Sequence, residues 1–184
     1  SSGKLTFLGG SRGGLHPVHR IGTGDGCQSL TTGDFDGDGY PDVVATDSSN
    51  SIQAEDGLLF FTGGPGGLLF KRKHPAYHPL YLVAGDFDGD GFPDVAAAGG
   101  GTVTFLHGGP DGLERPYSVA AGDAPLYGQT ISGIYGDRIA MTSGDFDGDG
   151  LADVLVANRS SGKLTFLGGS RGGLHPVHRI GTGD

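Results

Sequence analysis

The sequence has no tryptophan, a single cysteine (Cys27), and no apolar run approaching the length of a membrane span. One cysteine excludes a disulfide within the chain, and without such an apolar run we expect no membrane span. Basic residues are also scarce, with 12 Lys and Arg against 21 Asp and Glu and a formal net charge of −9. Nucleic acid binding depends on basic patches, so we expect no nucleic acid partner.

Recognisable catalytic motifs are missing as well. The sequence contains no GxSxG segment, and Cys27 has no paired-histidine signature around it. We therefore expect no enzymatic activity. The remaining question is why the acids are distributed so unevenly.

Twelve of the 21 acids lie in three copies of a nine-residue loop, at residues 34–42, 86–94 and 145–153, each beginning with the letters DFDGDG. Aspartate occupies positions one, three, five and nine: Asp34, Asp36, Asp38 and Asp42; Asp86, Asp88, Asp90 and Asp94; Asp145, Asp147, Asp149 and Asp153. Carboxylates this close repel one another unless a cation lies between them. The alternative is an acidic, solvated turn, which a threefold repetition in register disfavours.

The donor set predicts which cation these loops bind. All the side-chain ligands are hard oxygens, which favours calcium over zinc or copper, and magnesium prefers to keep several waters. Glycine at position six permits the sharp turn that such a loop needs. Three calcium ions per chain would bring the net charge from −9 to −3.

The loops differ from an EF-hand, which requires glutamate at position twelve and flanking helices. Position twelve is Ala45, Ala97 or Val156, within short apolar runs that favour strands. An apolar strand precedes each loop, and two more surround a later Gly-rich turn. Four strands per unit of roughly 50 residues predict an all-β fold of β-propeller-type blades with four antiparallel strands.

A further repetition joins the two ends of the sequence. Residues 1–25 recur unchanged at 160–184, an offset of 159 residues that keeps the loops in register. We therefore expect about three blades per 159-residue tandem unit. The expected divisions are a partial blade at 1–25, blades at 26–78 and 79–137 (the latter with an extended loop near 121–137), and a blade at 138–184. A duplicated end made by engineering is the alternative.

This pattern resembles the FG-GAP (VCBS) repeat, the blade type of integrin α-subunit propellers and of many secreted bacterial proteins. The resemblance rests on the DxDxDGxxD loop, the apolar strand after it and the later FLGG-type turn, and it covers essentially the whole chain. It implies an extracellular or cell-surface location. It also implies that the carbonyl of position seven, in Tyr40, Phe92 and Leu151, is a further calcium ligand, and that Phe35, Phe87 and Phe146 at position two fix each loop on its blade.

Together these features predict a calcium-binding extracellular structural or adhesive module, part of a tandem-repeat fibre or surface assembly. Its partners would be preceding and following units or identical chains, in an open filament or a six-bladed ring. The alternative is a carbohydrate-binding, lectin-like propeller with glycan partners, although sugar sites usually offer aromatic platforms and the chain has no Trp and six Tyr. Asn158 begins an N-glycosylation triplet.

Overall fold

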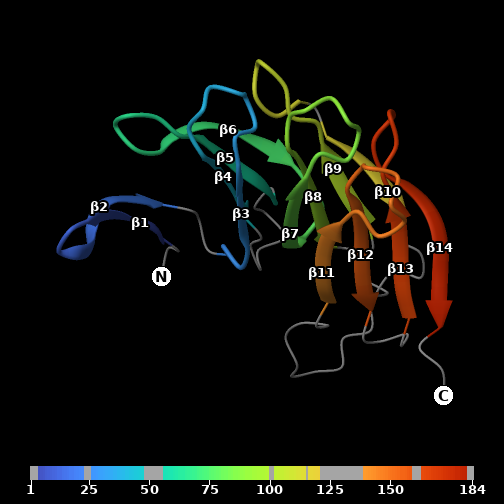
Figure 1. Ribbon diagram of the computed structural model, residues 1–184. Helices are drawn as coiled ribbons and strands as arrows, with labels where there is room; N and C mark the ends of the chain where they lie inside the picture. The colour runs from blue at the N-terminus through green and yellow to red at the C-terminus, as the bar shows by residue number, and fades with distance from the viewer. Residues whose placement is uncertain are drawn as a thin grey trace, which may run out of the picture.

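The computed structural model describes residues 4–22, 26–47, 56–99, 102–114, 116–120, 139–158 and 163–181. Over these ranges the chain forms fourteen β-strands and no helix. None of the described residues therefore belongs to a helix long and apolar enough to cross a membrane. The strands form three four-stranded sheets and one two-stranded hairpin (Figure 1). The predicted all-β fold of four-stranded, propeller-like blades is confirmed.

The three sheets, here called blades one to three, follow one another along the chain. Blade one contains β3 (Leu30–Gly33), β4 (Asp42–Asp47), β5 (Gly57–Thr62) and β6 (Leu69–Pro75). Blade two contains β7 (Pro79–Gly85), β8 (Asp94–Gly99), β9 (Thr102–Leu106) and β10 (Tyr117–Ala120). Blade three contains β11 (Ile139–Gly144), β12 (Asp153–Asn158), β13 (Lys163–Gly168) and β14 (His175–Gly181). Consecutive strands are neighbours, so each blade is an antiparallel meander.

The inner strands of the blades are buried on both faces. β4 and β8 are buried along almost their whole length, whereas β6 is exposed at every residue except His74. Runs of Val, Phe and Leu suit such strands because branched and aromatic side chains fill a pleated, buried surface. A sheet with two apolar faces must be covered on both, and here neighbouring blades cover one another.

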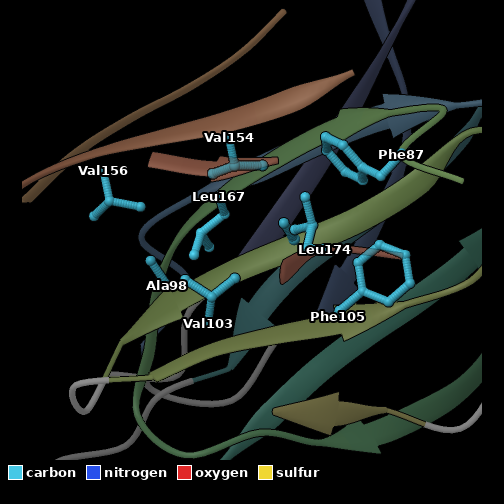
Figure 2. Packing of buried hydrophobic residues seen from close by; sticks show 9 residues of the cluster. Phe87, Ala98, Val103, Phe105, Val154, Val156, Leu167 and Leu174 are labelled. Atoms are coloured by element: carbon cyan, nitrogen blue, oxygen red, sulfur yellow. The ribbon is translucent and has the colours of Figure 1, made fainter. Parts of the chain in front are cut away.

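The hydrophobic core accordingly lies between blades. Val44, Leu58 and Phe60 of blade one meet Val95 and Leu106 of blade two in one cluster. A second cluster joins blades two and three through Phe87, Ala96, Ala98, Val103, Phe105, Val154, Val156, Leu167 and Leu174 (Figure 2). Because side chains alternate along a strand, β4 sends Val43 and Ala45 to its opposite face.

That opposite face of blade one is covered by the N-terminal hairpin, β1 (Lys4–Ser11) and β2 (Gly14–Gly22). Leu5 and Ile21 of the hairpin pack against the cluster containing Ala45 and Phe61. Figure 1 shows this hairpin and blade three at opposite ends of the molecule, with blades one and two between them.

The duplicated sequence forms the same local structure twice. β1 pairs with β2 from Lys4↔Gly22 onward, and β13 pairs with β14 from Lys163↔Gly181 in the same register. Both pairs shift register after the phenylalanine, between Phe7 and Leu8 and between Phe166 and Leu167. Local sequence therefore determines the register and the bulge, although β1 and β2 pair as far as Ser11↔Gly14 and β13 and β14 only as far as Gly168↔His175.

Two of the sequence predictions concern residues that the structure does not describe. The extended loop expected near residues 121–137 lies outside the described ranges. Asn158 is the last residue of β12, but the rest of its glycosylation triplet, residues 159 and 160, also lies outside them. Both stay predictions, as do the boundaries expected between the blades.

Candidate metal sites

Each aspartate loop connects the first two strands of a blade: β3 to β4, β7 to β8, and β11 to β12. Those strands pair directly, from Gly33↔Asp42 in blade one and Gly85↔Asp94 in blade two. The loop must therefore reverse the chain within a few residues. Glycine at position six adopts a left-handed φ in every copy, +88° at Gly39 for example, a conformation that costs other residues energy.

The loop aspartates stabilise this tight turn themselves. The position-three and position-five carboxylates accept the backbone N–H two residues further on, as in Asp38 N to Asp36 Oδ1 (3.2 Å) and Tyr40 N to Asp38 Oδ1 (2.8 Å). Position one accepts the N–H of the position-six glycine, with Gly39 N to Asp34 Oδ2 at 2.9 Å. Such Asx turns are a common property of aspartate in tight loops. They bring carboxylates that are distant along an extended strand to one side of the loop.

Blades two and three repeat these bonds. In blade two, Gly91 N donates to Asp86 Oδ2 at 3.1 Å and Phe92 N to Asp90 Oδ1 at 2.9 Å. In blade three, Gly150 N donates to Asp145 Oδ2 at 3.1 Å and Leu151 N to Asp149 Oδ1 at 2.9 Å. The similar geometry in all three copies indicates that the loop sequence specifies its own conformation.

The position-nine aspartates anchor the loops to the blades. Asp42, Asp94 and Asp153 are all fully buried. Asp94 accepts hydrogen bonds from Phe87 N at 2.8 Å, in its own loop, and from Gly108 N at 2.9 Å, in the Gly-rich turn of the same blade. Burial raises the pKa of Asp94 to about 6, although both backbone bonds act in the opposite direction. Burial likewise raises the pKa of Asp42. A cation beside these carboxylates would favour their ionised form.

Acidic side chains converge in all three loops. Ligand atoms that lie within 4.8 Å of one another belong to Asp34, Asp36 and Asp42; to Asp86, Asp88 and Asp90; and to Asp145, Asp147 and Asp153. Asp38 and Asp149 belong to none of these groups, and Asp94 belongs to a separate one with Asp88 and His107. Three of the four predicted carboxylates therefore meet in each loop, and the main-chain oxygens of Tyr40, Phe92 and Leu151 stay predicted ligands.

One buried oxygen supports the fit of a cation to these loops. Asp34 Oδ1 is buried and has no hydrogen-bond partner, while the other oxygen of the same carboxylate accepts Gly39 N–H. A buried carboxylate oxygen without a partner is costly. A hard divalent cation among three carboxylates would satisfy that oxygen and offset the repulsion between the acids. The residues present thus fit a divalent metal.

His107 also lies beside the blade-two loop, although no motif in the sequence indicated this residue. Its Nδ1 lies 2.8 Å from Asp88 Oδ2 and 4.0 Å from Asp94 Oδ1. The corresponding residues of the Gly-rich turn are Thr62 in blade one and Gly168 in blade three, so at this position blade two alone carries a histidine. The difference between the three turns was visible in the sequence, but the contact depends on a turn 19 residues away folding back to the loop.

The loops also connect one blade to the next. Phe35 O accepts a hydrogen bond from Gly109 N of blade two at 2.9 Å. Phe87 O accepts the equivalent bond from Ser170 N of blade three at 3.0 Å. The side chains of Phe35 and Phe87 are fully buried in the interblade clusters. Both loops are therefore structural contacts between blades as well as candidate metal sites.

Phe146 is less buried than the other two position-two phenylalanines. Each of the three rings packs on a phenylalanine of its own blade, and Phe146 lies 6.4 Å from Phe166 between ring centroids, as expected for a residue that fixes the loop on its blade. Its backbone N–H also donates to Asp153 Oδ2 at 2.8 Å, as in the other loops. The side chain of Phe146 is nevertheless 52% exposed, because among the described residues no following blade covers it.

Comparison with known proteins supports the repeat assignment. A model of the FG-GAP-like repeat matches residues 86–156, and a model of the FG-GAP repeat matches residues 28–52 and 139–174. Integrin alpha-7 from Homo sapiens is 27% identical over 170 residues, which cover 83% of this chain. The match covers 14% of integrin alpha-7, so the chain spans about one-seventh of that relative's length.

A solved structure supports the architecture. A chain in the crystal structure of BBS1N in complex with ARL6DN, soaked with lead, is similar to this chain with a TM-score of 0.52 and 17% identity. The similarity covers 84% of this chain and 43% of the other, and at this identity it bears on the fold alone. The repeat models match segments in all three blades, and the loops they contain have one geometry. The chain therefore belongs to the FG-GAP repeat proteins, with a fold of β-propeller blades.

Proposed function

We propose that this chain is a calcium-binding extracellular structural or adhesive module whose three loops each hold one calcium ion. The observation that carries the proposal is the convergence of three carboxylates in every loop, including the partnerless buried oxygen of Asp34. All the candidate ligands of the predicted set are oxygens, the chemistry that calcium prefers. We propose a binding role, with no catalytic step assigned to any residue.

The metal would act on the contacts between blades. In blades one and two, the ion would lie in a loop whose first residues also contact the next blade, as Asp86 O does by accepting Ala152 N–H at 3.0 Å. An ion that fixes the loop therefore fixes the interblade contact. Calcium binding to the folded state alone would add RT ln(1 + [L]/Kd) of stability per site, about 2.7 kcal/mol at a hundredfold excess over Kd.

The adhesive role and the location rest on similarity. Integrin alpha-7 is a relative with the same repeats, and we propose a surface or secreted location on that basis. The duplicated 25-residue segment supports a tandem-repeat assembly, because it continues the blade pattern in register.

The experiment that tests calcium binding is a titration by isothermal calorimetry of chelator-treated protein. Three ions per chain are expected. Asp147→Asn should reduce the count to two, because it removes one of three converging carboxylates from the blade-three loop. Asp111→Asn is the matched control, since Asp111 is an exposed acid of the blade-two Gly-rich turn outside every loop.

Thermal melting provides a second readout. Removal of calcium with EGTA should lower the melting temperature, and added calcium should restore it. An unchanged melting temperature together with no heat of binding would contradict the calcium assignment.

A further inference from the structure

The two copies of the duplicated hairpin differ in their strand partners. β13 lies between β12 and β14 in a four-stranded sheet, whereas β1 pairs with β2 alone in a two-stranded sheet. Among the described residues, β1 therefore leaves one edge unpaired. A free strand edge is a template for pairing with another strand.

The strand with the free edge, β1, has the same sequence as β13, the strand with which β12 already pairs. β12 pairs with β13 in the antiparallel register Val154↔Leu167, Val156↔Thr165 and Asn158↔Lys163. The equivalent residues of β1 are Leu8, Thr6 and Lys4. Because residues 4–22 and 163–181 are identical, β12 can form the same set of pairings with either hairpin.

The apolar side chains of the N-terminal hairpin are also only partly covered. Leu167 and Leu174 are 0% and 4% exposed in the cluster between blades two and three, whereas the identical Leu8 and Leu15 are 45% and 73% exposed. A Cβ placed on Gly173 would lie 3.0 Å from Phe105, but one placed on Gly14 would have nothing within 4 Å. The hairpin thus presents the surface that blade two normally covers.

Blade three presents the complementary half. Phe146 is 52% exposed, while the equivalent Phe35 is fully buried by the blade that follows it. A Cβ placed on Gly37 would contact Phe92 of the next loop, and one placed on Gly89 would contact Leu151. A Cβ placed on the equivalent Gly148 would have no neighbour within 4 Å. Among the residues that the structure describes, no following blade covers the outer face of blade three.

The N-terminal hairpin shows where that following blade lies. Phe7 is the copy of Phe166, and it lies 3.4 Å from a Cβ placed on Gly67 of blade one. The same contact joins blades one and two, where Phe60 of blade one lies 2.8 Å from a Cβ placed on Gly112. The hairpin thus occupies the position of a blade before blade one, and among the described residues it supplies only the last two of the four strands. In the sheet that contains the identical hairpin, the first two strands are β11 and β12.

We propose that two copies of this chain associate head to tail, with β11 and β12 of one copy completing the sheet begun by β1 and β2 of the next. The shared blade would pack on blade two of the first copy through Leu8 and Leu15, and on blade one of the second through Phe146. One of the two identical hairpins is released, namely β13 and β14 of the first copy. β12 exchanges its pairing with β13 for an identical pairing with β1, so the strand pairing itself favours neither state. Burial of Phe146 is gained only in the joint, and it therefore favours association.

The joint is heterologous, because each copy uses a different surface at each end. Repetition of a heterologous contact forms an open filament or a closed ring. Pairing of β12 with β1 inside one copy is disfavoured by their positions at opposite ends of the molecule (Figure 1). The inference deepens the assembly part of the proposed function and does not require that the loops bind calcium.

The test uses the full 184-residue chain with Cys27→Ser as the background, so that every thiol is introduced. One protein carries Asn158→Cys and the other carries Lys4→Cys. After incubation together, a short bis-maleimide should link them into a heterodimer, because the proposed register places these residues opposite each other. The matched control replaces Lys4→Cys by Ser11→Cys, at the far end of β1, and should give no heterodimer.

Sedimentation of the unmodified chain provides the second measurement. The mass should rise with concentration, and Phe146→Ser should weaken the association by about tenfold or more, the factor for losing burial of one large apolar side chain. Circular dichroism would confirm that the variants fold. A monomer at every concentration, equal cross-linking of both pairs, or association without the 158–4 link would overturn the proposal. Calcium content measured on the same samples separates a failure of this joint from a failure of the calcium assignment.

Discussion

The duplicated segment allows one side chain to be tested in two environments within a single molecule. Leu174 is 4% exposed and packs in the cluster between blades two and three, while Leu15, with identical sequence neighbours, is 73% exposed. Replacing a buried leucine with alanine costs about 2–5 kcal/mol, because apolar contacts are lost and a cavity remains. An exposed replacement changes stability by less than about 0.5 kcal/mol.

These energies predict a large difference in urea denaturation. With a slope of about 2 kcal/mol/M, a loss of about 3 kcal/mol lowers the midpoint by about 1.5 M. Leu174→Ala should therefore shift the midpoint by roughly this amount, and Leu15→Ala by about 0.25 M or less. The assay is far-UV circular dichroism in excess calcium, at a protein concentration where sedimentation shows a monomer.

The comparison needs no other control protein, since each variant is the control for the other. Equal shifts for Leu174→Ala and Leu15→Ala would refute the reasoning, because they would mean that the two copies have equivalent environments in the isolated chain. A large shift for Leu15→Ala alone would invert the assignment of the buried copy.

Two more predictions follow from the packing. Burial, with a smaller contribution from Arg72, lowers the pKa of His74 to about 4, whereas an unfolded histidine titrates near 6.5. The unfolded state therefore binds this proton first, so His74 contributes a loss of about 3 kcal/mol of stability as pH decreases from 6.5 to 4. Asp94 acts in the opposite direction over the same range, because its pKa is raised to about 6 in the folded state. In urea titrations the unmodified chain should therefore lose about 3 kcal/mol more than His74→Phe between pH 6.5 and 4, and equal changes in the two proteins would contradict this. Gly173→Ala should lower the melting temperature more than Gly14→Ala. Both glycines have a left-handed φ, but only Gly173 faces Tyr117 and Phe105. Equal melting temperatures for the two variants would count against the packing at Gly173.

Much of the fold was predictable because its signals are local and repeated. Short apolar runs separated by glycine turns predicted strands, and three copies of each run predicted four-stranded blades. The aspartate loops were predictable for the same reason, since Asx turns and a left-handed glycine act within nine residues. The converging carboxylates of Asp34, Asp36 and Asp42 follow from that local geometry.

Other features of the site depend on contacts between distant segments. His107 reaches Asp88 only because the turn after β9 folds over the loop after β7. Phe146 lies in the same six residues, DFDGDG, as Phe35 and Phe87, yet it is half-exposed because burial of this side chain is completed by the next blade. These six identical residues do not distinguish the exposed copy from the buried ones.

The sequence by itself determined the hairpins, the loops and their repetition, because each depends on neighbours within a few residues. Identical residues at 4–22 and 163–181 consequently share one register and one bulge, although β1 and β2 pair as far as Ser11↔Gly14 and β13 and β14 only as far as Gly168↔His175. Only the tertiary structure decided that Leu167 is buried while Leu8 is half-exposed. The physical reason is that burial depends on which surface lies opposite: β12 and blade two cover one copy of the segment, and the other copy keeps a free edge.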